Sequence, residues 1–180
     1  MTRLRTIAWL IAALSLAASG RAQAAAGLLD EAEFGILAHD IPIGGDHREQ
    51  GADFNGEALF VSPGLLAPIW APRPHLGISI NSAGGNSYAY FGLTWTANFT
   101  ESFYGDLGLG GAVHDGPDQS TESNHKGLGT RFLFHESVEF GYRVSPPWSV
   151  GVFLDHISNA DIGSHNPGLT NLGLRVGYTF

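Results

Sequence analysis

The chain has 180 residues, with 17 acidic and nine basic side chains and a formal net charge of −8. That length suits a single domain, and the acidic balance argues against nucleic-acid binding, which needs a basic face. The absence of cysteine excludes disulfide bridges, C-x-x-C redox sites and cysteine-ligated zinc.

Residues 1–24 are typical of a secretory signal peptide. Two arginines give a positive start, the run 7–18 is almost unbroken apolar sequence, and Ala-Gln-Ala at 22–24 supplies a small-x-small cleavage pattern. The apolar run is well short of the ~20 residues that a membrane-spanning helix needs. We therefore expect this segment to be removed and residues 25–180 to form the domain; a retained membrane anchor is the alternative.

Eight later segments alternate apolar with small or polar residues at period two, which is the pattern of half-buried strands. They lie at Glu31–Ala38, Asn55–Val61, His75–Asn81, Tyr88–Phe99, Phe103–Val113, Thr130–Val144, Trp148–Ser158 and Thr170–Phe180. The alternation is clear in the second half and weak in the first two segments. Several are about as long as the ~9–11 residues that a transmembrane strand needs.

A soluble β-sandwich and a membrane barrel both produce this alternation, with opposite faces turned inward. Three features favour the barrel. The polar faces carry glycine and charges of both signs, which suits a narrow, filled lumen. Thr100–Ser102 and Ser145–Pro147 are short, while His114–Gly129 and Asn159–Leu169 are long, as in barrels with short turns at one end. The chain also ends in an aromatic residue, Phe180.

We therefore predict an all-β fold, an eight-stranded antiparallel transmembrane β-barrel with a filled lumen and no pore. Charged residues on the polar faces are expected to neutralise one another inside it. These residues are Asp106, Arg131, Glu139, Arg143, Asp155 and Arg175. The connection Ser62–Pro74 is too long for a turn at the short-turn end, and the sequence offers no account of it.

No G-x-S-x-G, H-E-x-x-H or P-loop motif is present. The scattered histidines provide no ligand spacing for a metal, and loop histidines such as His39 are expected to be solvated.

One pair of polar residues has an unusual position in a predicted strand. His156 and Ser158 continue the parity of the apolar residues Trp148 to Leu154 and would point outward at the end of the strand. Either this polar pair is functional or the strand has already left the membrane there; parity favours neither.

The segment His156-Ile157-Ser158-Asn159-Ala160, followed by Asn166-Pro167-Gly168, resembles the PagL family of lipid A 3-O-deacylases, broadly acyloxyacyl hydrolases. The stretch from Phe134-His135-Glu136-Ser137 to Gly141-Tyr142-Arg143 and the ending Gly177-Tyr178-x-Phe180 are similar to that family as well. The resemblance covers most of the chain after residue 70 and is strongest near the end.

This resemblance implies a serine esterase on the outer wall of an outer-membrane barrel, which removes the ester-linked 3-hydroxyacyl chain at position 3 of lipid A. Its partners would be lipid A or lipopolysaccharide and outer-membrane lipids, with a homodimer left open and no cofactor or metal required. By position, Ser158 would be the nucleophile and His156 the general base. Asn159, with Asn166 or a backbone N–H near Gly168, would line an oxyanion hole.

The chain departs from the family at the acid of the triad, because Thr170 stands where the family has glutamate. Strand parity offers a substitute. The tight turn at Ser145–Pro147 pairs positions summing to about 292–294, which puts Glu136 opposite His156 or Ser158 on the outward face. Directly opposed Cβ atoms lie ~5 Å apart. We therefore hypothesise that Glu136 orients His156, with Asp161 in the following loop as a second candidate.

Two further functions compete with the esterase. A non-catalytic barrel with a degenerate site, serving envelope stability or surface interaction, is consistent with Thr170. Small-molecule transport is disfavoured by the filled lumen.

Overall fold

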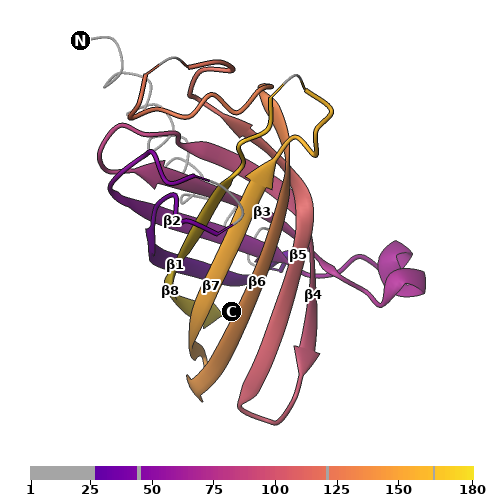
Figure 1. The fold of residues 1–180 in the computed structure, drawn as a ribbon. Coiled ribbons are helices and arrows are strands. Elements are labelled where there is room, and N and C mark those ends of the chain that lie inside the picture. The colour runs from indigo at the N-terminus through magenta and orange to yellow at the C-terminus, as the bar shows by residue number, and fades with distance from the viewer. Residues whose placement is uncertain (1–26, 44–45, 121, 164) are drawn as a thin grey trace, which may run out of the picture.

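The computed structural model describes residues 27–43, 46–120, 122–163 and 165–180. The expected signal peptide lies outside them. Eight strands form a closed antiparallel barrel in which each pairs with its neighbours in sequence and β8 closes on β1 (Figure 1). The strands are β1 Leu29–Ala38, β2 Ala52–Phe60, β3 Arg73–Asn81, β4 Tyr88–Asn98, β5 Phe103–His114, β6 Phe132–Ser145, β7 Trp148–Ser158 and β8 Leu169–Thr179.

All eight predicted strands are confirmed, with ends that differ by at most three residues. The largest difference is at β2, which begins at Ala52 rather than at Asn55. The sequence signal is weak there because the outward positions Gly56 and Ala58 are small and the apolar Leu59 lies on the otherwise polar lumen face. Phe54 is 58% exposed on the outer wall, whereas Asp53 is fully buried in the lumen.

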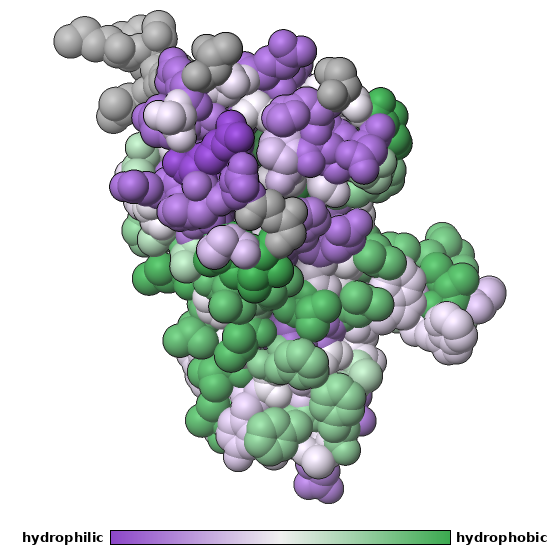
Figure 2. Space-filling model, in the orientation of Figure 1, coloured by the Kyte–Doolittle hydropathy of each residue, from purple (hydrophilic) through white to green (hydrophobic). Residues whose placement is uncertain are grey.

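The barrel has the polarity of a membrane protein. Apolar side chains cover its outer wall, such as Phe140 at 65% exposure and Leu174 at 68%, while the charged Glu139 and Arg175 are 2% and 4% exposed. Figure 2 shows this as a hydrophobic wall below a hydrophilic cap. A soluble sandwich would bury the apolar face instead, so the fold is a transmembrane barrel.

An ion cluster fills part of the lumen. The Arg175 guanidinium meets three carboxylates, Glu139 at 2.6 Å, Glu57 at 2.7 Å and Glu33 at 2.5 Å. Buried charge is tolerated where it is paired in this way. Asp106 faces Arg73 at 3.5 Å, as part of the same lumen lining.

The expected neutralisation is wrong for two arginines. Arg131 and Arg143 are exposed at opposite ends of β6, beyond the lumen. Arg131 donates to the carbonyl of His114 at 2.7 Å, and Arg143 donates to the Asn98 side chain at 2.7 Å. Alternation assigned them to the inner face but could not show that the strand continues past the packed interior.

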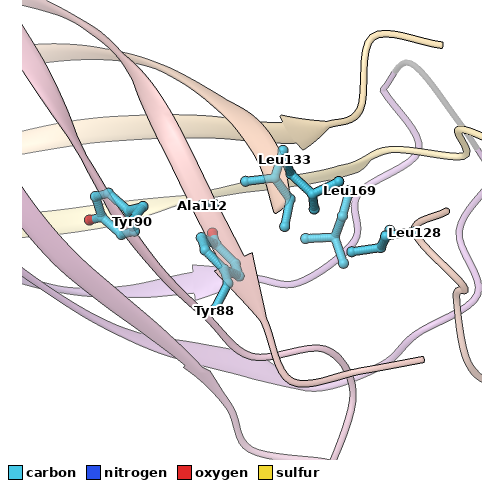
Figure 3. Close-up of a cluster of buried hydrophobic side chains, with 7 residues drawn as sticks. Tyr88, Tyr90, Ala112, Leu128, Leu133 and Leu169 are labelled. Carbon is cyan, nitrogen blue, oxygen red and sulfur yellow. The ribbon is translucent and has the colours of Figure 1, made fainter. Parts of the chain in front are cut away.

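Apolar and aromatic side chains complete the filling. A buried cluster lies inside the barrel and consists of Tyr88, Tyr90, Ala112, Leu128, Leu133, Ile157 and Leu169 (Figure 3). Tyr90 stacks on His135 with ring centroids 4.2 Å apart, and the Tyr88 hydroxyl bonds Asp155. The predicted filled lumen is therefore confirmed.

The connections divide between the two ends of the barrel. The loop end, as we call it, carries the segments 39–51, 82–87, 115–131 and 159–168. The turn end carries the other three connections, together with the first and last described residues. One of these, from 61 to 72, is the long connection that the sequence left unexplained. It contains the 3₁₀ helix η1, Gly64–Ile69, which projects sideways from the wall (Figure 1).

Candidate functional site

His156 and Ser158 occupy the loop end of β7 and point outward. Their neighbours Asp155 and Ile157 are fully buried in the lumen, while the even-numbered residues of the strand are exposed or half-buried. The parity expected from the sequence is therefore confirmed. Both side chains are half-buried, so they lie on the outer wall where the strand meets the loops.

The imidazole of His156 is held from β8. His156 and Thr170 are directly paired across the two strands, and His156 Nδ1 lies 2.7 Å from Thr170 Oγ1. The Thr170 hydroxyl has one proton, which it donates to the carbonyl of Ile43 at 2.8 Å. It must therefore accept from Nδ1–H. This assignment leaves Nε2 unprotonated in the neutral ring, which is the tautomer that a general base requires.

On the other side of His156, the predicted register is confirmed. Glu136 pairs with His156 and Phe134 pairs with Ser158, so each sum is 292. Glu136 is exposed on the outward face, yet among the described residues no hydrogen bond or ion pair joins it to His156. The contact to Nδ1 comes from Thr170 instead. Asp161 is exposed in the loop at a φ of 59° and makes no bond to His156 either.

The loop after β7 shows which donors remain free. Asn159 is 1% exposed, and its amide donates both protons, to the carbonyls of Leu128 at 2.9 Å and His165 at 2.7 Å. Its side chain therefore has no proton left for an oxyanion. Asn166 turns its oxygen toward the N–H of Asn159 at 2.9 Å, and within the described chain its NH₂ group has no partner.

Gly168 lies against the imidazole. Its φ is 61°, a conformation that glycine adopts without strain. A Cβ at this position would come within 2.7 Å of His156 Cε1 and 3.1 Å of Nε2. The glycine therefore leaves the backbone close to the Cε1–Nε2 edge of the imidazole. Asn166 and Gly168 are the two expected oxyanion residues that the geometry keeps available.

A buried polar network, here called the loop network, ties the loop end together around Lys126. Lys126 is 2% exposed; its ammonium pairs with the Asp40 carboxylate and donates to the Gly168 carbonyl at 3.0 Å. Its backbone N–H donates to Glu49 at 2.8 Å, and its carbonyl accepts from Asn86 at 2.9 Å. One residue thereby joins all four connections at the loop end.

His39 extends the loop network and is not solvated as expected. It is 2% exposed, with Nε2 2.8 Å from Glu49 and Nδ1 3.0 Å from Asp53. Burial lowers its pKa, but hydrogen bonds and charge from Asp53 and Glu49 outweigh burial and raise the pKa to about 9. The resulting stabilisation is fully present below the ordinary pKa of about 6.5 and is lost as the pH rises through about 9.

Replacing Lys126 by methionine should open the loop end while the barrel stays folded. The change leaves the buried Asp40 carboxylate without its cation, a loss worth about 3–5 kcal/mol for a buried pair. We expect faster amide hydrogen exchange in segments 39–51 and 165–170. Arg48→Met is the matched control, because within the described residues the Arg48 side chain forms only an exposed pair with Asp46 at 3.5 Å and such pairs contribute little. Equal exchange in the two variants would contradict this role.

Comparison with known proteins supports the resemblance seen in the sequence. The family model described as Lipid A 3-O-deacylase (PagL) matches residues 65–179. The lipid A deacylase PagL of Bordetella bronchiseptica is 34% identical over 86 residues, which are 48% of this chain and 44% of that protein. The match thus spans less than half of the relative's length.

Solved structures support the fold. The structure of the outer membrane enzyme PagL aligns with a TM-score of 0.60 at 17% identity, over 83% of this chain and 99% of that chain. The N-terminal β-barrel domain of Pseudomonas aeruginosa OprF gives 0.54 at 11% identity, over 84% and 98%. A designed transmembrane β-barrel gives 0.55 at 12% identity, over 86% and 96%. At these identities the likeness concerns the barrel alone.

Proposed function

Because the chain belongs to the PagL family of lipid A 3-O-deacylases, we propose that it is an outer-membrane serine esterase that removes the 3-hydroxyacyl chain at position 3 of lipid A. The observation that carries the proposal is the outward-facing pair His156 and Ser158, with the imidazole held in the tautomer of a base. The short turns, the start of β1 and the end of β8 belong on the periplasmic side of such a barrel, so the pair would lie at the outer leaflet, where lipid A resides.

The proposed reaction uses groups of this chain only. His156 Nε2 takes the proton of Ser158 as its oxygen attacks the ester carbonyl, and the charge moves to the carbonyl oxygen. The free NH₂ group of Asn166 and the N–H of Gly168 are the donors for that oxyanion, each worth ~3 kcal/mol when well placed. His156 then protonates the departing sugar oxygen, which leaves as a hydroxyl. Water, deprotonated by the same ring, attacks the acyl carbonyl, and Ser158 leaves with the proton that the ring returns to it.

The residue that contacts Nδ1 of His156 is a threonine, Thr170, whereas a complete triad has a carboxylate at this place. A carboxylate both orients the ring and stabilises its positive charge during the reaction, whereas the neutral hydroxyl of Thr170 can only orient it. We infer that the site keeps its geometry and loses part of its rate. The same feature is what favours the second candidate function, a non-catalytic barrel with a degenerate site.

Mass spectrometry of lipid A tests the proposal. Lipid A from Gram-negative cells that produce the protein should lose one 3-hydroxyacyl chain, and lipid A from cells that produce Ser158→Ala should keep it. Heat-dependent migration on gels would establish that both barrels are folded. If lipid A stays intact with the folded wild-type protein, both in cells and in purified mixtures, the esterase proposal is wrong and the non-catalytic role is favoured.

Two substitutions separate the candidates for orienting His156. Thr170→Val removes the hydroxyl at nearly constant shape, and loss of a neutral hydrogen bond of about 1 kcal/mol predicts a roughly fivefold lower kcat. Glu136→Gln should leave kcat unchanged, because among the described residues no hydrogen bond or ion pair joins Glu136 to the ring, whose Nδ1 meets Thr170. The measurement is the initial rate of lipid A deacylation at saturating substrate. A fall in Glu136→Gln with none in Thr170→Val would assign the acid role to Glu136.

A further inference from the structure

The connection between β2 and β3 carries an apolar surface that no part of the barrel covers. Residues 61 to 72 include no charged side chain. None of the residues of η1 is buried, and large apolar side chains of the segment are exposed. Their exposed fractions are 50% for Val61, 78% for Leu65, 42% for Ile69 and 88% for Trp70. Figure 2 shows this segment as a mainly hydrophobic projection beside the wall.

The segment is held in a defined shape. Leu66 donates to Pro63 at 2.9 Å, and Trp70 and Ala71 donate back to Ala67 and Leu66 at 3.2 and 3.0 Å. The indole N–H of Trp95 on β4 donates to the carbonyl of Ile69 at 2.8 Å, which fixes η1 against the outer wall. These hydrogen bonds hold the backbone of the segment in one conformation, in which the apolar side chains of η1 stay exposed.

The position of residues 61–72 along the barrel axis indicates which part of the membrane surrounds them. Aromatic side chains gather on the outer wall at the turn end, as they do where barrels cross the membrane–water interface. This belt includes Phe99, Phe103, Tyr142, Trp148, Tyr178 and Phe180. The bond from Trp95 attaches η1 at the same end, so its apolar surface continues the lipid-facing surface of the wall. No helix in the described part of the chain is long and apolar enough to span a membrane.

The backbone chemistry suits lipid better than water. Pro63, Pro68 and Pro72 have no N–H, which reduces the number of donors that would be left unsatisfied near hydrocarbon. A tryptophan at the edge of an apolar segment is the residue that most favours the headgroup region. A protein partner would be expected to meet some charge or polar rim, and the segment from 61 to 72 has no charged residue.

We propose that residues 61–72 are an interfacial anchor, which inserts Leu65, Ile69 and Trp70 among the phospholipids of the periplasmic leaflet. A lateral projection inserted on one side of a barrel resists tilting and vertical movement of the barrel. The anchor thereby fixes the depth of the opposite, loop end relative to the outer leaflet. It is independent of whether the outward site is an active esterase.

The cysteine-free sequence makes a depth measurement direct. Leu65→Cys would carry a nitroxide spin label in phosphatidylethanolamine–phosphatidylglycerol vesicles, and its accessibility to oxygen and to a water-soluble nickel complex would be measured. Leu174→Cys on the outer wall is the lipid reference, and Glu101→Cys in the β4–β5 turn is the water reference. Heat-dependent migration on gels would show that each labelled barrel is folded.

The proposal predicts that the Leu65 label behaves as the Leu174 label does, with high oxygen and low nickel accessibility. Nickel accessibility equal to that of the Glu101 label would overturn it, since the segment would then face the periplasm. Spin–spin broadening at Leu65 that grows with protein density would also overturn it, because a second copy of the chain would then cover the segment.

Discussion

Ser158→Ala and His156→Ala should each lower the rate of lipid A deacylation by roughly a hundredfold. In serine proteases with a complete triad, loss of the nucleophile or base costs ~10⁶ in kcat, while loss of the acid alone costs ~10⁴. A site that lacks the acid has already lost the ~10⁴ that the acid contributes to kcat. Removing the nucleophile or base then costs the remaining ratio, ~10⁶ divided by ~10⁴, which is ~10². The measurement is kcat on purified lipid A with folded variants.

The two losses should also fail to add. If Ser158 and His156 act as a unit, the double variant retains the rate of either single variant. Additive losses would mean that the residues act separately, and the proposed proton transfer between them would be wrong. Ser149→Ala is a suitable control, because Ser149 is buried on the lumen face of the same strand.

Thr170→Glu should raise kcat, by tenfold or more and by at most ~10⁴, the value of a triad acid. Position 170 already contacts Nδ1 of His156, so a carboxylate there would meet the same proton and stabilise the ring when it becomes charged. Thr170 is 3% exposed and also bonds Ile43, so the segment around Ile43 must shift to admit the longer side chain. Because of that shift, we expect the increase in kcat to be smaller than the full ~10⁴.

Thr170→Gln is the matched control for charge, since it has the size of glutamate without the carboxylate. A carboxylate beside His156 also raises the imidazole pKa. Because the base must be neutral, the low-pH limb of the rate profile should move to higher pH in Thr170→Glu and stay in place in Thr170→Gln. Equal rates and equal profiles for the two variants would show that position 170 does not govern the base.

The period-two pattern predicted the strands and the outward placement of His156 and Ser158, and the polar-face composition, the loop lengths and the aromatic end favoured a barrel over a sandwich. Alternation identified every strand, and it assigned His156 and Ser158 to the outer face because side chains at i and i+2 share a face. The tight turn at Pro146 and Pro147 fixed the register of β6 and β7, which placed Glu136 opposite His156. These features are local, so a sequence pattern can carry them.

The features that the sequence did not predict depend on residues far apart in the chain. Lys126 meets Asp40 across 86 positions, and the Thr170 hydroxyl meets Ile43 across 127. A lone lysine in a polar loop is typical of a solvated side chain, and only the folded loop end shows that it is buried. The hydrogen bonds of the Asn159 amide could not be foreseen for the same reason, because one of its two acceptors, the carbonyl of Leu128, lies 31 positions away in another loop.

The central claim is that Ser158 is a nucleophile activated by His156 on the outer wall. Incubating the purified, folded protein with a fluorophosphonate probe and mapping the adduct by tandem mass spectrometry tests it most directly. We predict one adduct, on Ser158, that is lost or strongly slowed in His156→Ala. A folded protein that forms no adduct, or forms it on another serine, would show that Ser158 is not an activated nucleophile.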